Sequence, residues 1–164
     1  MIVKELCLDG FRNYNGLTVL FRDGVNIITG SNAQGKTNLI EAIYYLAAGR
    51  SFRQAGDKEL IAFDCDGARI SAEIVSNGRE QRLEARLFRG GRRELYANGV
   101  RLKKAAELAG RLTAVLFGPD DLEMIKDGAA VRRKLWTSVY RSFARDTSRR
   151  SASLTGCMNT NREY

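Results

Sequence analysis

Alternating apolar and polar residues at the start of the chain predict β-structure. Residues 3–9 read Val-Lys-Glu-Leu-Cys-Leu-Asp, a pattern that favours a strand. The Phe-Arg-Asn-Tyr-Asn-Gly run over residues 11–16 predicts a turn, and residues 17–21 predict a second strand. The chain is therefore expected to open with two short strands joined by a turn.

A different pattern follows Gly24. Residues 25–28 form a short apolar, β-branched run that predicts a buried strand, and residues 30–35 predict a glycine-rich loop. From Lys36 the apolar residues recur at intervals of three and four, which predicts a helix that ends at Gly49. The pattern thus gives the order strand, glycine-rich loop, helix.

The middle of the chain predicts an antiparallel meander of short strands. Asn-Gly pairs at residues 77–78 and 98–99 are hairpin signals between stretches of alternating residues. These stretches are residues 68–75, 81–88, 94–96 and 100–102.

Three further elements are expected after the meander. Residues 103–112 predict a short helix, and residues 114–117 predict another buried strand. Asp120 and Asp121 are suited to cap a helix that follows them.

The composition of the chain changes near residue 135. The last 30 residues hold five Ser, four Thr, two Asn and five Arg, with few aliphatic residues and no usable period. We therefore predict one domain over residues 1–134 and a tail over residues 135–164 that is frameshifted or disordered.

Composition restricts the possible chemistry. The 164 residues are 44% hydrophobic, enough for one folded core, and carry a net charge of +8. The absence of His excludes any mechanism that needs a His base or ligand. Three widely spaced cysteines favour a reducing compartment, and neither a signal peptide nor a membrane span is recognisable. We expect a cytoplasmic protein.

One motif carries specific chemistry: Gly30-Ser31-Asn32-Ala33-Gln34-Gly35-Lys36-Thr37 fits GxxxxGK[ST]. Its glycines allow successive backbone N–H groups to face phosphate oxygens, and the following helix presents its positive end to the same anion. Lys36 supplies a charge for the β- and γ-phosphates, and the Thr37 hydroxyl is placed to bind Mg²⁺. A glycine-rich turn that only caps a helix is the structural alternative.

Four stretches are distinctive in combination. They are residues 8–14 (LDGFRNY), 30–46 (GSNAQGKTNLIEAIYYL), 49–53 (GRSFR) and 115–122 (VLFGPDDL). In this order and spacing they resemble the RecF family of bacterial DNA-repair ATPases, which belongs with the SMC-like, ABC-type P-loop ATPases. The resemblance extends over residues 1–134.

The resemblance implies an α/β fold. It implies an incomplete ABC-type ATP-binding lobe, with a mixed sheet around the P-loop and an antiparallel β-meander beside it. It also implies that Arg12 and Asn13, in the early turn, contact ATP. Arg12 as a surface residue beside a turn is the alternative.

The resemblance also implies a function in DNA replication and recombinational repair. ATP and Mg²⁺ would be the cofactors, and ATP would drive homodimerisation. Single-stranded or gapped DNA, linear duplex ends or junctions, and recombination-mediator proteins would be the partners. Recombinase loading, the SOS response to DNA damage and a weak DNA-dependent ATPase activity follow for the full-length family, with no membrane involved.

The sequence departs from the family pattern after Pro119. Asp127 stands where a Gly is expected, Ala129 stands where a Pro is expected, and residues 135–137 replace an aromatic-aliphatic-Asp end. We find no candidate for the Walker B acids or the signature motif, so no catalytic set is complete and hydrolysis is left open. An ABC transporter ATPase fragment and a non-functional remnant are the rival interpretations.

The tail has an explanation at the level of the gene. If the codons of residues 141–163 are shifted back by one nucleotide, ordinary codon choices give QLRPRYVQALGELNRLHEHKQRV without a stop. This segment has apolar residues at helical spacing and resembles the helical arm that follows in RecF proteins. We therefore interpret the tail as a frameshift rather than a divergent segment.

Other charged and aromatic residues have competing interpretations. A basic cluster around the predicted hairpins would either contact phosphates or form a solvated rim. Its members are Arg89, Arg92, Arg93, Arg101, Lys103 and Lys104. Glu41 and Glu59 could each be mistaken for a catalytic acid. Glu41, one turn into the predicted helix, is expected to be a solvated helix residue. Tyr44, Tyr45 and Phe52 are expected in the core or an interface.

Overall fold

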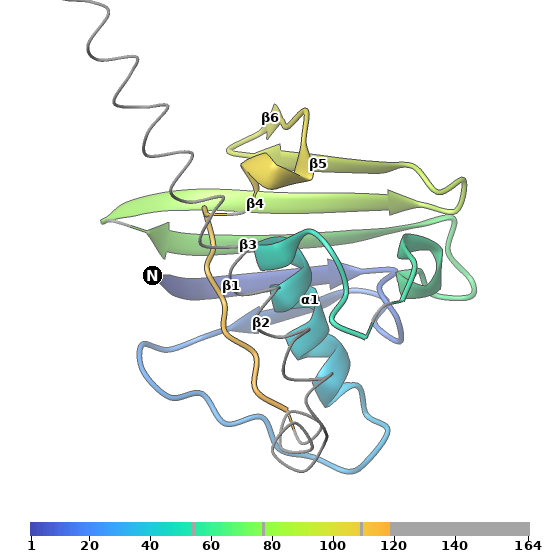
Figure 1. Ribbon diagram of the computed structural model, residues 1–164. Helices are drawn as coiled ribbons and strands as arrows, with labels where there is room; N and C mark the ends of the chain where they lie inside the picture. Colours follow the sequence, from blue (N-terminus) through green and yellow to red (C-terminus); the bar gives the residue numbers. More distant parts are fainter. Residues whose placement is uncertain (54, 77, 109, 119–164) are drawn as a thin grey trace, which may run out of the picture. The chain divides into compact units, whose positions relative to one another are not determined.

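The computed structural model describes residues 1–53, 55–76, 78–108 and 110–118. Six strands form one sheet in the order β2-β1-β3-β4-β5-β6, and every neighbouring pair is antiparallel. Among the described residues, one α-helix lies against this sheet (Figure 1). The elements are β1 (Ile2–Asp9), β2 (Leu17–Leu20), α1 (Lys36–Ala48), β3 (Gly67–Ser76), β4 (Arg79–Phe88), β5 (Arg93–Ala97) and β6 (Val100–Arg101), with 3₁₀ turns η1 (Asp57–Leu60) and η2 (Ala105–Glu107).

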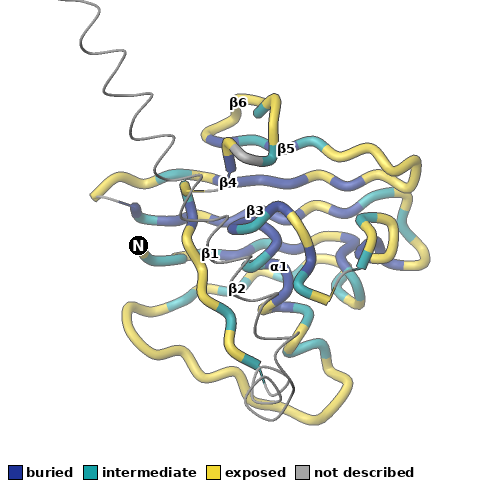
Figure 2. Tube along the Cα trace, viewed as in Figure 1, coloured by how far each residue is buried: buried dark blue, intermediate teal, exposed yellow. Residues whose placement is uncertain are grey.

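The core lies between α1 and the central strands. Alternation along a strand puts every second side chain on one face, and the register aligns these side chains across β1, β3 and β4. Leu8 faces Ile70, which in turn faces Ala85, and all three are buried. From the helix, Tyr45 and Leu46 are fully buried in the same cluster. Figure 2 shows buried segments in α1 and in the central strands.

Charged side chains on β3 and β4 that alternate with the core residues form ion pairs. The Glu84 carboxylate accepts hydrogen bonds from Arg69 at 2.9 Å and from Arg86 at 2.6 Å. Burial opposes ionisation of Glu84, but the two guanidinium groups outweigh it and hold the pKa of this carboxyl below its ordinary value.

The structure confirms the locally encoded elements. The helix spans Lys36–Ala48 and ends at Gly49, whose left-handed backbone (φ 68°) closes it as expected. Asn98 and Gly99 both have positive φ, as a type I′ hairpin requires, and they join β5 to β6. The predicted strands of the meander are all present.

Four sequence predictions are wrong. Residues 25–28 and 114–117 form no strand and are largely exposed, with Val25 88% and Val115 95% accessible. The described residues between 103 and 112 contain only the short turn η2, and Gly110 adopts a left-handed φ of 94° that no helix continues. Where a mixed sheet was expected, the strands of the described residues are all antiparallel to their neighbours, and residues 25–28 pair with none of them.

The predicted helix after Asp120 and Asp121, and the predicted tail, lie outside the described residues. Within the described part of the chain, no helix is long and apolar enough to cross a membrane.

Candidate phosphate-binding site

The loop before α1 has the backbone of an anion-binding turn. Ala33 (φ 64°) and Gly35 (φ 95°) both adopt left-handed conformations, and alternation of this kind directs neighbouring N–H groups to one side. No side chain caps the N-terminus of α1, and its first turn contains no acidic residue. The N–H groups at this end therefore remain suited to an external anion.

The Lys36 side chain folds back onto the start of the loop. Its ammonium group donates to the carbonyl of Gly30 at 2.7 Å and to that of Ser31 at 2.6 Å. One cation thus lies beside the convergent N–H groups without a carboxylate partner among the described residues.

The turn over residues 11–14 packs against the same loop. Asn13 donates to the carbonyl of Gln34 at 3.3 Å and accepts from the side chain of Asn38 at 2.8 Å. A Cβ at Gly35 would lie 2.6 Å from the Asn13 amide and 2.8 Å from the Tyr14 hydroxyl. Only glycine therefore allows this close approach.

The burial of Glu41 differs from the sequence-based prediction. We expected a solvated helix residue, but its side chain is fully buried, because the face of α1 that carries it turns inward. The carboxylate accepts two hydrogen bonds from Arg12, at 2.9 and 3.0 Å, and one from Ser51 at 2.5 Å. Arg53 lies 3.5 Å from the same carboxylate. Glu59, in contrast, is exposed.

The charge of Glu41 is maintained by these partners. Burial alone would raise the pKa of this carboxyl, but hydrogen bonds from Arg12 and Ser51 and the charges of Arg12 and Arg53 outweigh burial and lower the pKa. The network also reaches the loop, because Arg53 donates to Asn38 at 2.9 Å and Asn38 contacts Asn13. Glu41 thus links the 11–14 turn, the helix and residues 51–53.

The structure brings most predicted site residues together. Asn13 contacts the loop directly, and Arg12 is oriented toward Glu41 at the neighbouring turn of α1. Sequence reasoning missed Asn38, Glu41, Ser51 and Arg53 as parts of this network. The available signal was spacing: Asn38, Glu41 and Tyr45 recur at three and four, on one side of the helix.

Of the three aromatic residues near the site, Tyr45 lies in the core, as expected, and Tyr44 and Phe52 are half-buried. Tyr45 is fully buried, and its hydroxyl donates to Asp57 at 2.8 Å. Burial is the main reason that the pKa of Tyr45 is raised, so it stays protonated. Tyr44 and Phe52 pack edge to face with ring centroids 5.7 Å apart.

The donor set of the loop fits ATP with Mg²⁺. Among the described residues, no group of three His, Cys, Asp or Glu side chains is placed to hold a metal on its own. Thr37 is exposed at the helix start, and Mg²⁺ is commonly held by few protein ligands together with substrate phosphates. The Thr37 hydroxyl is the side chain here that would hold Mg²⁺ beside bound phosphates.

Comparison with known proteins identifies relatives of this chain. The family model described as RecF/RecN/SMC N terminal domain matches residues 2–123. The DNA replication and repair protein RecF of Clostridium acetobutylicum is 42% identical over 134 residues, covering 82% of this chain and 37% of the relative. RecF of Agathobacter rectalis matches to the same extent, with 42% identity over 134 residues. The chain thus spans little more than a third of the length of the curated relatives it matches.

Solved structures show the same relationship. The recombination mediator protein RecF, solved as RecF-ATP in the RecFOR pathway, superposes with a TM-score of 0.75 at 38% identity, covering 84% of this chain and 38% of that chain. An SMC ATPase from a study of ATP-driven dimerisation has a TM-score of 0.72 at 22% identity. This chain covers 98% of that SMC ATPase chain, and the likeness concerns the fold.

Proposed function

Because this chain belongs to the RecF family, within the RecF/RecN/SMC N-terminal domain, we propose that it holds the phosphates of ATP for a DNA replication and repair ATPase. The family assignment decides against the transporter ATPase that a P-loop alone would also allow. The observation that carries the proposal is the packing of the 11–14 turn against the loop that holds Lys36.

Each residue has a role in this proposal. Backbone N–H groups over residues 30–37 bind the phosphate oxygens, Lys36 neutralises their charge, and Thr37 holds Mg²⁺. Bound phosphate would replace the Gly30 and Ser31 carbonyls as the partner of the Lys36 ammonium. Asn13 holds the loop in place, and Arg12 supplies a second cation near the nucleotide. ATP bound here contributes its own chemistry, a phosphoryl group that can be transferred to water.

The remaining parts of the site come from outside residues 1–134 in this proposal. Phosphoryl transfer depends on positioned groups around the γ-phosphate, and the chain offers no recognisable acids for that step. We therefore expect weak ATP binding and little turnover by these residues alone. In a full-length member of the family, ATP-dependent homodimerisation, contact with gapped DNA and mediator proteins, and recombinase loading in the cytoplasm would follow.

Equilibrium binding of a fluorescent ATP analogue with Mg²⁺ tests the proposal. Lys36→Ala removes charge-assisted hydrogen bonds worth about 1.5–3 kcal/mol, which corresponds to a roughly 10- to 100-fold loss of affinity. Lys58→Ala, at an exposed lysine of η1, is the matched control and should leave binding unchanged. Equal affinity for wild type and Lys36→Ala, or no binding by any of the proteins, would refute the proposal.

A further inference from the structure

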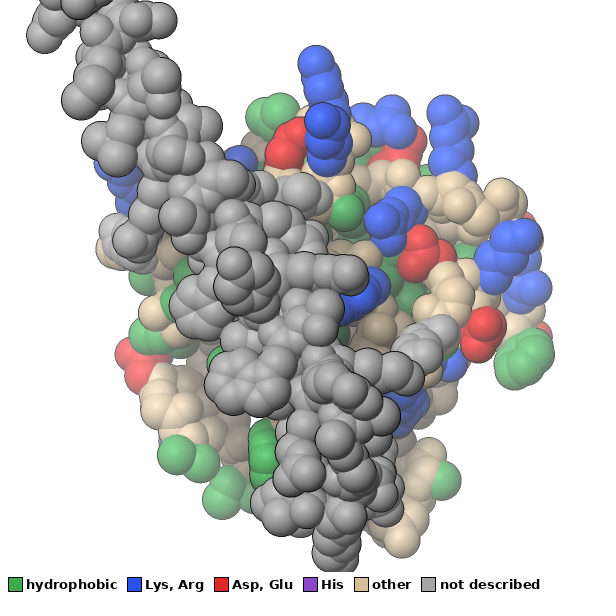
Figure 3. Space-filling model, in the orientation of Figure 1, with side chains coloured by type: hydrophobic (Ala, Val, Ile, Leu, Met, Phe, Trp, Pro, Cys, Tyr) green, Lys and Arg blue, Asp and Glu red, His purple; other side chains and the backbone are tan. Residues whose placement is uncertain are grey.

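The positive charge of the described fold is concentrated in one segment. Residues 1–118 hold 18 Lys and Arg against 13 Asp and Glu, a net charge of +5. Residues 89–104 alone hold six basic residues and one acidic residue, which is also +5. The rest of residues 1–118 is therefore neutral overall. Lys and Arg side chains accordingly gather at the β4–β6 side of the molecule (Figure 3).

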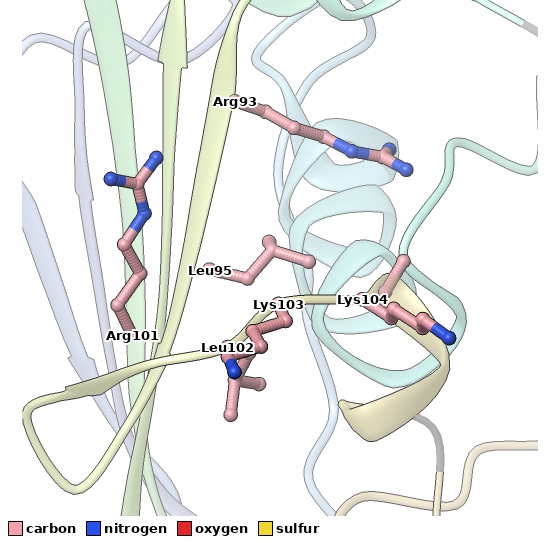
Figure 4. Close-up of a pocket in the computed structure, with 7 residues that line it drawn as sticks. Arg93, Leu95, Arg101, Leu102, Lys103 and Lys104 are labelled. Carbon is pink, nitrogen blue, oxygen red and sulfur yellow. The ribbon is translucent and has the colours of Figure 1, made fainter.

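This segment surrounds a cavity of about 620 Å³. Four cationic side chains line it, with three apolar residues and no acidic one (Figure 4). We call it the basic cavity; its lining residues are Arg93, Leu95, Arg101, Leu102, Lys103, Lys104 and Ala105.

Two of the four cations are already engaged. Arg93 donates to the carbonyl of Gly49 at 2.8 Å, where it complements the negative end of α1, and Arg101 pairs with Glu94 at 3.0 Å. Lys103 and Lys104 are exposed, and no carboxylate among the described residues pairs with them. They supply unneutralised charge at the rim of a cavity whose other cations are fixed in place.

The cavity is separate from the phosphate-binding loop. The loop lies at the N-terminal end of α1, whereas Arg93 binds the carbonyl of Gly49 at the other end. A 13-residue helix is about 20 Å long, at 1.5 Å per residue. A ligand of the basic cavity is therefore different from the phosphates of an ATP bound at the loop.

We propose that the basic cavity binds the phosphodiester backbone of DNA, through Lys103 and Lys104, without reading sequence; this rests on the proposed function. Unpaired lysines are point charges suited to phosphate oxygens. The lining contains no aromatic ring on which a base could stack, so backbone contact is favoured over recognition of a free nucleotide. A free polyphosphate shares this chemistry, and the experiment separates the two ligands.

Fluorescence anisotropy with a gapped duplex, measured over a salt series, tests the assignment on the full chain. The slope of log K against log salt is negative, and each lost phosphate contact reduces its magnitude by about 0.9. Lys103→Ala/Lys104→Ala should therefore reduce the magnitude of the slope by nearly 2. Between 50 and 200 mM salt, the wild type should then lose about tenfold more affinity than the variant. Arg22→Ala/Arg79→Ala removes the same charge from exposed sites elsewhere and should leave the slope nearly unchanged.

Two further arms make the result decisive. Binding of the ATP analogue should be equal in wild type and Lys103→Ala/Lys104→Ala, which shows that the variant is folded and tests the loop independently. Tripolyphosphate at matched phosphate concentration should not displace the DNA. Equal slopes for wild type and the lysine variant, an equal effect of the arginine control, absence of DNA binding, or displacement by tripolyphosphate would each overturn the assignment. If the wild type does not bind the ATP analogue, that result would instead contradict the proposed function.

Discussion

At the residue scale, the site depends on Gly35, because the absence of a Cβ there lets Asn13 and Tyr14 pack against the loop. Gly35 and Gly16 have nearly the same φ, 95° and 92°, but differ in their surroundings. A Cβ at Gly16 would meet nothing within 4 Å, whereas one at Gly35 would collide with Asn13 and Tyr14. A substitution at Gly16 therefore introduces backbone strain alone, whereas one at Gly35 also introduces a steric clash.

We expect Gly35→Ala to weaken ATP binding much more than Gly16→Ala. Both substitutions bear the cost of a left-handed Ala, roughly 1–2 kcal/mol of folding stability, but only Gly35→Ala displaces the 11–14 turn from the loop. Nucleotide titration and thermal unfolding of both variants provide the measurement. Similar ATP affinities in the two variants would show that the packing of the turn is irrelevant to the loop.

Glu41 is the second residue on which the site depends. Glu41→Gln keeps the shape of the side chain but leaves Arg12 and Arg53 without their counter-charge. Because both arginines are partly exposed, we expect a loss of about 1–3 kcal/mol in the free energy of unfolding at pH 7.

The contribution of Glu41 to the free energy of unfolding should depend on pH. The native pKa of Glu41 is lowered, so its stabilisation is present above the ordinary Glu pKa of about 4.3 and is lost as pH falls through the native value. Urea unfolding of wild type and Glu41→Gln should differ at pH 7 and converge in acid. Glu80→Gln, at an exposed strand position, should match wild type throughout. A constant difference at all pH values would show that the buried charge is not the cause.

Part of the site could be predicted at this scale. The position of Lys36 and Thr37 at the start of a helix follows from the motif and from the helical period after it, and the structure shows it. The burial of Glu41 could not be predicted, because it depends on Arg12 and Ser51, which are 29 and 10 residues away in the chain. A buried carboxylate is recognised only after its partners have been placed.

At the element scale, predictions succeed where the signal is local. The helix Lys36–Ala48 and the Asn98-Gly99 hairpin follow from a 3.6-residue period and from turn residues with positive φ. The strands expected at residues 25–28 and 114–117 fail, because an apolar run becomes a buried strand only when neighbouring strands cover it. No described strand does so.

The contact between α1 and the sheet should dominate the stability of the fold. Leu46 is fully buried in the core, so Leu46→Ala is expected to lower the free energy of unfolding by about 2–5 kcal/mol. Ile40, on the same helix, is 39% exposed, and Ile40→Ala should cost clearly less. Denaturant titration of the pair measures the difference. Equal losses would mean that the helix does not pack through the Leu46 face.

At the scale of the whole molecule, the two ends of α1 carry different chemistry. The N-terminal end presents the loop with Lys36, and the C-terminal end adjoins the basic cavity, where the net charge is concentrated. If both proposals hold, a polyanion and a nucleotide would be bound at the same time, about one helix length apart. Exposed Val25 and Ile27 precede the loop, on a segment for which no described strand provides a partner.

Hydrogen exchange of the full chain, with and without Mg²⁺-ATP, tests the central claim most directly. If residues 30–37 cradle the phosphates, ATP should slow amide exchange over residues 30–38 and in the adjoining 11–14 turn, relative to Mg²⁺ alone. The same addition to Lys36→Ala should produce little protection at equal ATP concentration. Unchanged exchange over residues 30–38 in the wild type at saturating ATP, or protection confined to other segments, would contradict the claim that this loop binds the nucleotide.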